Sequence, residues 1–134
     1  MMPAVVPVDW LARHLDDPDL VILDVRVGLT ASGARADRDG YLTSHIPGAV
    51  FADLPGEFSD TTTHLAFALS SPEAVCAAAG RLGVGDSSRV VLYDTVQHTP
   101  AGPLGAVWAA RLWWMLRAVG FDEVAVLDLS LIHI

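Results

Sequence analysis

The sequence predicts an α/β domain in which a doubly wound parallel sheet is flanked by helices. Three apolar runs carry this prediction: LVILD at 20–24, RVVLY at 89–93 and EVAVL at 123–127. None of them alternates polar with apolar residues, which is typical of strands buried on both faces. Helices are expected at 71–82 and 106–119. The order strand, helix, strand, helix, strand implies a parallel sheet with right-handed crossovers.

Composition and net charge indicate which kinds of binding partner suit the chain. The chain has 134 residues, of which 52% are hydrophobic and 18% charged, as in a globular domain, and it shows no internal repeat or interdomain linker. The net charge is −8 and all eight basic residues are arginine. An acidic chain without a basic stripe is poorly suited to bind nucleic acid or an anionic membrane, so neither partner is expected.

Cysteine content and the N-terminus indicate a cytoplasmic location. Cys76 is the single cysteine, so no disulfide can form within the chain. The first ten residues lack the basic and apolar regions of a signal peptide. The longest apolar stretch, 101–121, is interrupted by Arg111 and Arg117, which argues against a membrane span. No metal or cofactor is expected.

The N-terminal part begins with a helix expected at 9–15, capped by Asp9 and followed by the strand at 20–24. Residues 27–40 contain three glycines and no apolar periodicity, and are expected to form a loop. Its mixed charges favour a solvated surface, because exposed charge pairs are common and weak. These charged residues are Arg35, Asp37, Arg38 and Asp39.

The stretch 41–51, YLTSHIPGAVF, places His45 between a helical turn and a short strand at 49–51. Pro47 pushes Ile46 toward an extended conformation, and Gly48 permits a tight turn. A histidine satisfied by nearby backbone is the commoner outcome at such a position. A role as general base or switch is the alternative, because imidazole titrates near neutral pH.

Residues 53–70 are expected to be irregular, and Ser71 then caps a helix whose end is marked by Gly83. Cys76 lies in the middle of this alanine-rich helix and is expected to be a small core side chain without reactivity. Residues 95–105 are expected to form a loop. The following helix carries Trp108, Trp113 and Trp114, which are expected to pack in the core.

Asp94 follows the strand at 89–93, and ligands of parallel α/β sheets bind at the carboxyl ends of the strands. Four segments resemble the rhodanese (sulfurtransferase) superfamily in the same order. They look most like the N-terminal domain of two-domain thiosulfate and 3-mercaptopyruvate sulfurtransferases. The segments are LVILDVR at 20–26, YLTSHIPGAVFADL at 41–54, SSPEAVCAAAGRLGVGDSSRVVLYD at 70–94 and AARLWWMLRAVGFDEVAVLD at 109–128.

The resemblance implies a rhodanese-like fold and the chemistry of that family. Catalytic members carry sulfur as a persulfide on a cysteine that follows the strand matching 90–93, within a cradle of backbone N–H groups. Asp94 occupies that position here, and a carboxylate cannot carry a sulfane sulfur. The resemblance therefore implies a non-catalytic domain whose partner is a missing C-terminal rhodanese domain, with a small anionic sulfur donor as substrate.

The resemblance also nominates residues for contact with that substrate or with the partner domain. His45 matches a histidine implicated in some mercaptopyruvate-type members, together with an aspartate for which Asp37 is a candidate. The charged stretch before it adds Arg35 and Arg38. Residues 1–128 are expected to form the rhodanese-like domain. The apolar tail 129–134 departs from the family pattern, and is expected to reflect a truncated chain or an unusual natural end.

Two other interpretations fit the same residues less well. A stand-alone, non-catalytic rhodanese-like binding or regulatory module would also lack the cysteine. A phosphatase-like or arsenate-reductase-like enzyme would need a cysteine and an arginine-bearing loop after Tyr93, and the sequence has neither.

Overall fold

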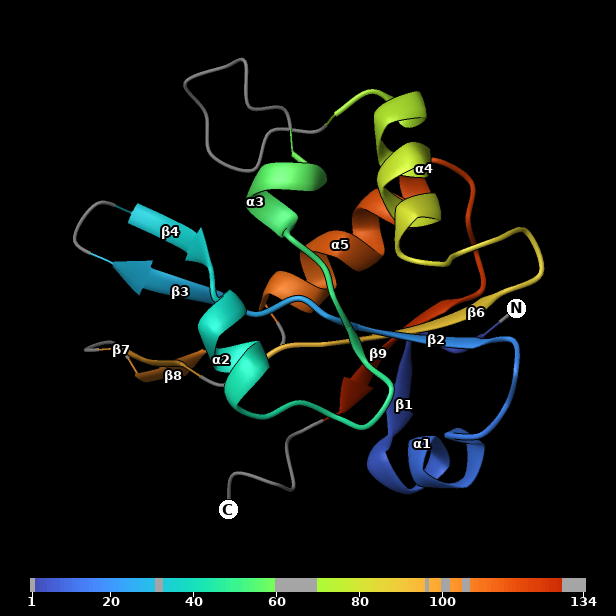
Figure 1. The fold of residues 1–134 in the computed structure, drawn as a ribbon, viewed down its shortest axis with the longest axis horizontal. Coiled ribbons are helices and arrows are strands. Elements are labelled where there is room, and N and C mark those ends of the chain that lie inside the picture. The colour runs from blue at the N-terminus through green and yellow to red at the C-terminus, as the bar shows by residue number, and fades with distance from the viewer. Residues whose placement is uncertain are drawn as a thin grey trace.

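A five-stranded parallel sheet forms the centre of the computed structural model, which describes residues 2–30, 33–59, 70–95, 97–99, 102–104 and 107–128. The strand order is β1-β9-β6-β2-β5 (Figure 1). The predicted fold class is confirmed, since every pair in this sheet is parallel. The strands are β1 (Val5–Pro7), β2 (Leu20–Asp24), β5 (Val50–Phe51), β6 (Arg89–Tyr93) and β9 (Val124–Asp128).

Helices cover both faces of this sheet. One core cluster joins the sheet to α3, α4 and α5, and the other joins it to α1 and α2. Neighbouring residues of a strand face opposite clusters: Leu23 lies in the first and Ile22 in the second. The apolar runs are therefore buried on both sides, as predicted. The helices are α1 (Val8–His14), α2 (Arg38–Thr43), α3 (Leu54–Glu57), α4 (Pro72–Arg81) and α5 (Val107–Ala118).

The residues predicted to begin and end α4 do so in the structure. The Ser71 hydroxyl accepts from the backbone N–H of Ala74 at 3.2 Å, and Gly83 follows the helix with a φ of 96°. The prediction for α1 is wrong in one respect. Pro7 is its N-cap residue, no side chain caps it, and Asp9 lies inside the first turn. From this position the Asp9 carboxylate accepts from the backbone N–H of Trp10 at 3.1 Å.

Two segments predicted as loops contain β-hairpins. Residues 27–40 hold β3 (Val27–Thr30) and β4 (Gly33–Ala36), followed by the start of α2, and residues 95–105 hold β7 (Gln97–Thr99) and β8 (Gly102–Leu104). Such short ladders form through main-chain hydrogen bonds and need no apolar periodicity, so side-chain patterns do not reveal them. Within 53–70, α3 is capped by Asp53, and residues 60–69 lie outside the described part, as does the tail 129–134.

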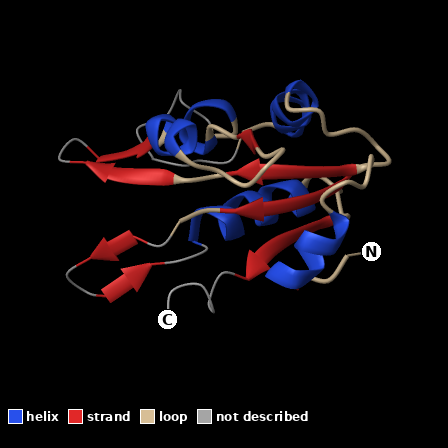
Figure 2. Ribbon diagram, turned by 60° about the horizontal axis from the view of Figure 1, so that its bottom comes forward, coloured by secondary structure: helices blue, strands red, loops and turns tan. Residues whose placement is uncertain are grey.

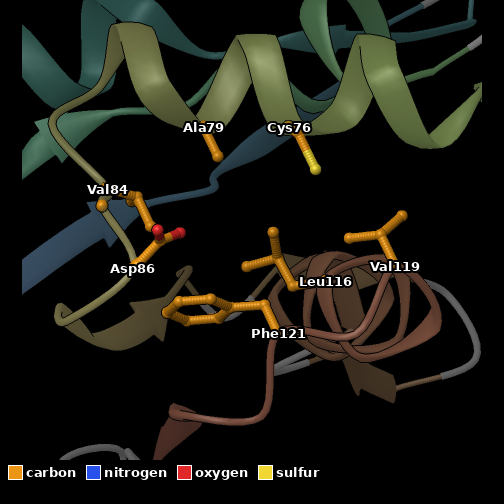
Figure 3. A pocket seen from close by; sticks show the side chains of 8 residues that line it. Cys76, Ala79, Val84, Asp86, Leu116, Val119 and Phe121 are labelled. Atoms are coloured by element: carbon orange, nitrogen blue, oxygen red, sulfur yellow. The ribbon is translucent and has the colours of Figure 1, made fainter.

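The prediction that Cys76 is a core side chain is wrong, because the thiol is exposed. The buried stripe of α4 consists of Val75, Ala78 and Ala79, and position 76 lies beside this stripe. Cys76 lines a shallow, largely apolar pocket of about 120 Å³ between α4 and α5 (Figure 3). Residues just before β6 and β9, such as Val84 and Phe121, also line it, which places this pocket toward the amino ends of the strands.

The tryptophans of α5 divide into two groups. Trp108 and Trp113 pack against the core as predicted, and Trp113 Nε1 donates to the Val124 carbonyl at 3.2 Å. For Trp114 the core prediction is wrong: the residue is 45% exposed and lies under the Arg111 guanidinium, 4.8 Å from the ring centroid. A cation over an indole face stabilises an exposed ring without burying it. In the described part of the chain, no helix has the length and apolar character needed to cross a bilayer.

Candidate functional site

The carboxyl edge of the sheet collects the polar side chains of interest. Because the strands are parallel, β2 and β6 deliver Asp24 and Asp94 to the same edge. The two hairpins extend beyond this edge (Figure 2), and the hairpin of β3 and β4 leads into α2. This is the edge at which ligands bind in open α/β sheets.

Asp94 is a buried carboxylate at the start of α5. The residue is 2% exposed, and its Oδ2 accepts from the backbone N–H groups of Trp108 at 2.9 Å and Ala109 at 3.0 Å. These are among the first amides of the helix, which carry the positive end of its dipole and lack partners within the helix. The helix start thus offers an anion site, and the carboxylate of Asp94 fills it.

Asp24 and Arg26 form a buried ion pair beside it. Arg26 Nη2 lies 2.7 Å from Asp24 Oδ2, with the two side chains 9% and 0% exposed. The Arg26 Nε and backbone N–H also donate to the same carboxylate. Burial works to lower the pKa of Arg26, but the hydrogen bonds and charge of Asp24 outweigh it and raise that pKa. The guanidinium also donates to the Ser44 carbonyl at 2.9 Å.

Tyr93 lies opposite Asp24 in the ladder between β2 and β6. Its side chain is buried, and the phenol oxygen accepts from the Ile46 backbone N–H at 3.0 Å. Burial is the largest cause that raises the pKa of Tyr93 to about 12, and the negative charge of Asp24 acts in the same direction. Tyr93 therefore remains a neutral phenol well above neutral pH.

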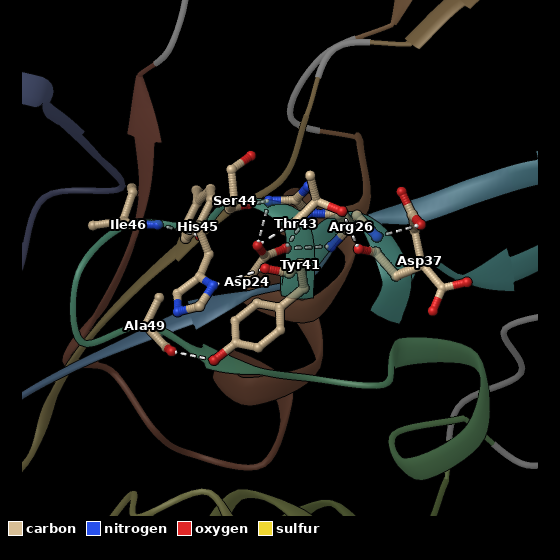
Figure 4. A network of polar contacts seen from close by, with 12 residues as sticks. Asp24, Arg26, Asp37, Tyr41, Thr43, Ser44, His45, Ile46 and Ala49 are labelled. Carbon is tan, nitrogen blue, oxygen red and sulfur yellow. Dashed lines mark hydrogen bonds and ion pairs between the residues drawn. The ribbon is translucent and has the colours of Figure 1, made fainter.

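His45 lies on the turn after α2 and is exposed. Its ring stacks on Tyr41 with centroids 4.0 Å apart and an interplanar angle of 13°, and its Nδ1 lies 2.7 Å from the Tyr41 carbonyl oxygen (Figure 4). The turn continues through Gly48, whose φ of 82° fits the predicted tight turn. The expected helical turn before His45 and strand after it are both present.

The other nominated residues surround α2. Asp37 is its N-cap, and the carboxylate accepts from the Gly40 backbone N–H at 3.0 Å. Arg38 places its guanidinium 4.7 Å from the centre of the Phe51 ring, and Arg35 lies exposed on β4. Asp37 and Arg38 thus lie at the start of one short helix, and His45 lies on the turn after its end. Arg35 lies on the strand that leads into this helix.

Sequence reasoning missed the contributions of Arg26 and Tyr93. A usable signal existed for Arg26, because an aspartate and an arginine two residues apart in an extended chain lie on the same side and can pair. Tyr93 carried no such signal, since an aromatic residue in an apolar run is normally a packing residue. Among the described residues, no group of three His, Cys, Asp or Glu side chains is arranged to hold a metal ion.

Comparisons with known proteins agree with this geometry. The family model for the rhodanese-like domain matches residues 7–131. The 3-mercaptopyruvate sulfurtransferase of Escherichia coli K12 is 38% identical over 123 residues, which cover 91% of this chain and 40% of that protein. Thiosulfate/3-mercaptopyruvate sulfurtransferase 2 of Arabidopsis thaliana is 41% identical over 124 residues, covering 92% of this chain and 33% of that protein.

A solved structure gives the same result. The crystal structure of SseA from Escherichia coli, described as a 3-mercaptopyruvate sulfotransferase with the rhodanese fold, superposes with a TM-score of 0.75 at 36% identity, covering 95% of this chain and 45% of that one. The chain therefore spans between a third and two fifths of the length of these curated relatives.

Proposed function

Because this chain belongs to the rhodanese-like domain family, we propose that it is the N-terminal, non-catalytic domain of a two-domain sulfurtransferase. The whole enzyme would take sulfur from thiosulfate or 3-mercaptopyruvate and pass it to a thiol or cyanide. The sulfur would travel as a persulfide on a cysteine of the C-terminal domain. The observation that carries this proposal is the match to sulfurtransferases over a third to two fifths of their length.

The geometry of Asp94 supports the non-catalytic assignment. A sulfur-carrying residue needs a thiolate that can attack the donor and leave again. Asp94 has no sulfur, and its carboxylate is already bonded to two amides at the start of α5. The anion site of this domain is thus filled by the chain itself.

In this proposal the domain has a structural role and forms one wall of the active site. The partner is the C-terminal rhodanese domain, and the substrate is a small anionic sulfur donor. His45, Arg35, Asp37 and Arg38 face that site or the partner, and the two arginines offset locally the net charge of −8. A cytoplasmic location fits the single cysteine. The relatives do not favour a stand-alone binding module, because the sulfurtransferases are matched only in part.

The experiment is a sulfur-transfer assay with thiosulfate or 3-mercaptopyruvate as donor and cyanide as acceptor. We expect no turnover from this chain alone. We expect turnover from a fusion in which this chain replaces the N-terminal domain of the Escherichia coli 3-mercaptopyruvate sulfurtransferase. The matched control is the same fusion with the cysteine nucleophile of the second domain changed to serine, which should be inactive.

Two results would contradict the proposal. Turnover by the isolated chain that is lost in Cys76→Ser would make the exposed thiol of α4 the sulfur carrier. A folded fusion that transfers no sulfur, while the parent enzyme does so under the same conditions, would remove the assignment to this type of enzyme.

A further inference from the structure

The backbone on both sides of His45 is held by two side chains at the carboxyl edge of the sheet. Arg26 Nη2 donates to the Ser44 carbonyl at 2.9 Å, and the Ile46 N–H donates to the Tyr93 hydroxyl at 3.0 Å. Figure 4 shows Arg26, Ser44 and Ile46 around this turn. The peptide groups flanking one exposed histidine are therefore tied to β6 and to the segment that follows β2.

Both anchors are themselves rigid. Arg26 is fixed by several hydrogen bonds to the buried carboxylate of Asp24, and Tyr93 is 4% exposed. Asp24 and Tyr93 are direct partners in the β2–β6 ladder. The two anchors thus keep a fixed separation, and each hydrogen bond restricts the backbone on one side of His45.

The ring of His45 is restricted as well. A carbonyl oxygen can only accept a hydrogen bond, so the 2.7 Å contact between Nδ1 and the Tyr41 carbonyl places the proton on Nδ1. Tyr41 is held in turn, since its hydroxyl donates to the Ala49 carbonyl at 2.6 Å. The neutral ring then carries its lone pair on Nε2, which makes no hydrogen bond to any described residue.

We propose that Arg26 and Tyr93 are positioning residues that hold His45 in one orientation, with the proton on Nδ1 and Nε2 presented as an acceptor. The functional part of this inference rests on the function proposed above: Nε2 would accept a proton or hydrogen bond from a group that the sulfur donor or the partner domain brings to this edge. The claim that Arg26 and Tyr93 fix the orientation of His45 concerns this chain alone.

His14 provides an internal reference. Its ring stacks on Trp10 with centroids 4.1 Å apart at 16°, and its Nδ1 lies 2.6 Å from the Trp10 carbonyl oxygen. The local contacts therefore copy those of His45. His14 lies in α1, however, and neither Arg26 nor Tyr93 bonds to its flanking peptides. A change that acts through these two anchors should therefore shift the tautomer ratio of His45 and leave the tautomer ratio of His14 unchanged.

The test is the tautomer of each histidine, read from ring ¹⁵N chemical shifts of the histidine-labelled chain at a pH of about 8.5, where imidazole is neutral. His45→Gln and His14→Gln assign the signals.

We expect the Nδ1–H form for both rings in the unchanged chain. In Tyr93→Phe and in Arg26→Gln, the ratio of Nδ1–H to Nε2–H at His45 should fall about five-fold, the value of one ordinary hydrogen bond. Arg26→Lys should restore part of the loss.

An Nε2–H tautomer at His45 in the unchanged chain would overturn the proposal. So would an unchanged His45 signal in a folded Tyr93→Phe chain, which lacks only one oxygen atom and decides the matter alone if Arg26→Gln does not fold. Equal shifts at His14 and His45 would indicate general loosening and count against positioning. Because no donor or partner is present, these outcomes are independent of the fusion assay.

Discussion

Asp24 and Tyr93 are ladder partners on β2 and β6, so a buried carboxylate and a buried phenol lie next to each other at the carboxyl edge of the sheet. The carboxylate fixes Arg26, which reaches Ser44, and the phenol bonds directly to Ile46. One pair of strand positions therefore supports the whole turn that carries His45.

Removal of the negative charge of Asp24 should lower the stability of the fold. Asp24→Asn keeps the size of the side chain but leaves the buried guanidinium of Arg26 without its counter-charge, and we expect the free energy of unfolding to fall by about 3–5 kcal/mol. Urea unfolding at neutral pH measures this. The control is Arg13→Gln, which breaks an exposed pair with Asp9 of 3.9 Å and should cost less than about 1 kcal/mol. Similar costs for the two variants would contradict the prediction.

Tyr93 should make the protein sensitive to alkaline pH. The pKa of Tyr93 is raised to about 12 in the folded chain, whereas an unfolded tyrosine ionises at about 10. The contribution is thus fully present below pH 10 and is lost as pH rises toward 12, by up to about 3 kcal/mol. The chain has no lysine to titrate in this range. Denaturant unfolding across this range should show a smaller loss in Tyr93→Phe than in the unchanged chain.

Gly40 should resist substitution although it lies within a helix. A Cβ at this position would be 2.5 Å from Asp37 Oδ2 and 3.0 Å from Arg26 Nη1, so it would displace the carboxylate that caps α2. Helix propensity favours alanine by about 1 kcal/mol, but we expect Gly40→Ala to lower stability by about 1 kcal/mol because the cap is lost.

The matched control is Gly80→Ala in α4, where a Cβ would meet nothing within 4 Å. That variant should gain about 0.5–1 kcal/mol. Thermal unfolding of both variants provides the comparison. A stabilised Gly40→Ala chain would mean that the contact with Asp37 is relieved at little cost.

Substitution of Asp94 should lower the stability of the fold by an amount that depends on the replacement side chain. Asp94→Ala removes the acceptor for two amides at the start of α5, and we expect a loss of about 2–3 kcal/mol. Asp94→Asn retains a carbonyl oxygen in the same place, so its cost should be smaller and should report the charge interaction with the helix start. Denaturant midpoints of the two variants measure the difference, and an Asn variant as unstable as the Ala variant would mean that charge dominates.

Sequence reasoning could predict four of the five strands of the sheet and the main helices, because their signals are local and repeated, but it missed β1. The run at 20–24 and the Ser71 cap report burial and chain direction without knowledge of their neighbours. The exposure of Cys76 could not be predicted, since adjacent positions of an alanine-rich helix differ only in which way they face. Asp94 could be placed at the sheet edge, but its bonds to α5 depend on a segment that the chain brings back from more than ten residues away.

Arg26 and Tyr93 escaped prediction for the same reason. Their partners, Ser44 and Ile46, are backbone groups, and any residue supplies a carbonyl or an amide. Side-chain patterns cannot reveal such contacts until the turn has been placed in space. The histidine itself could be nominated from the sequence, whereas the support beneath it required the structure.

The strand order has a consequence for biosynthesis. In the described part of the chain, β1 pairs with β9 alone, and β9 pairs in turn with β6. β1 therefore has no ladder partner until residues 124–128 have been made. The β2–β6 pair can form earlier, so β1 stays unpaired while residues 8–123 are made. A contact of such long sequence separation also favours slow folding.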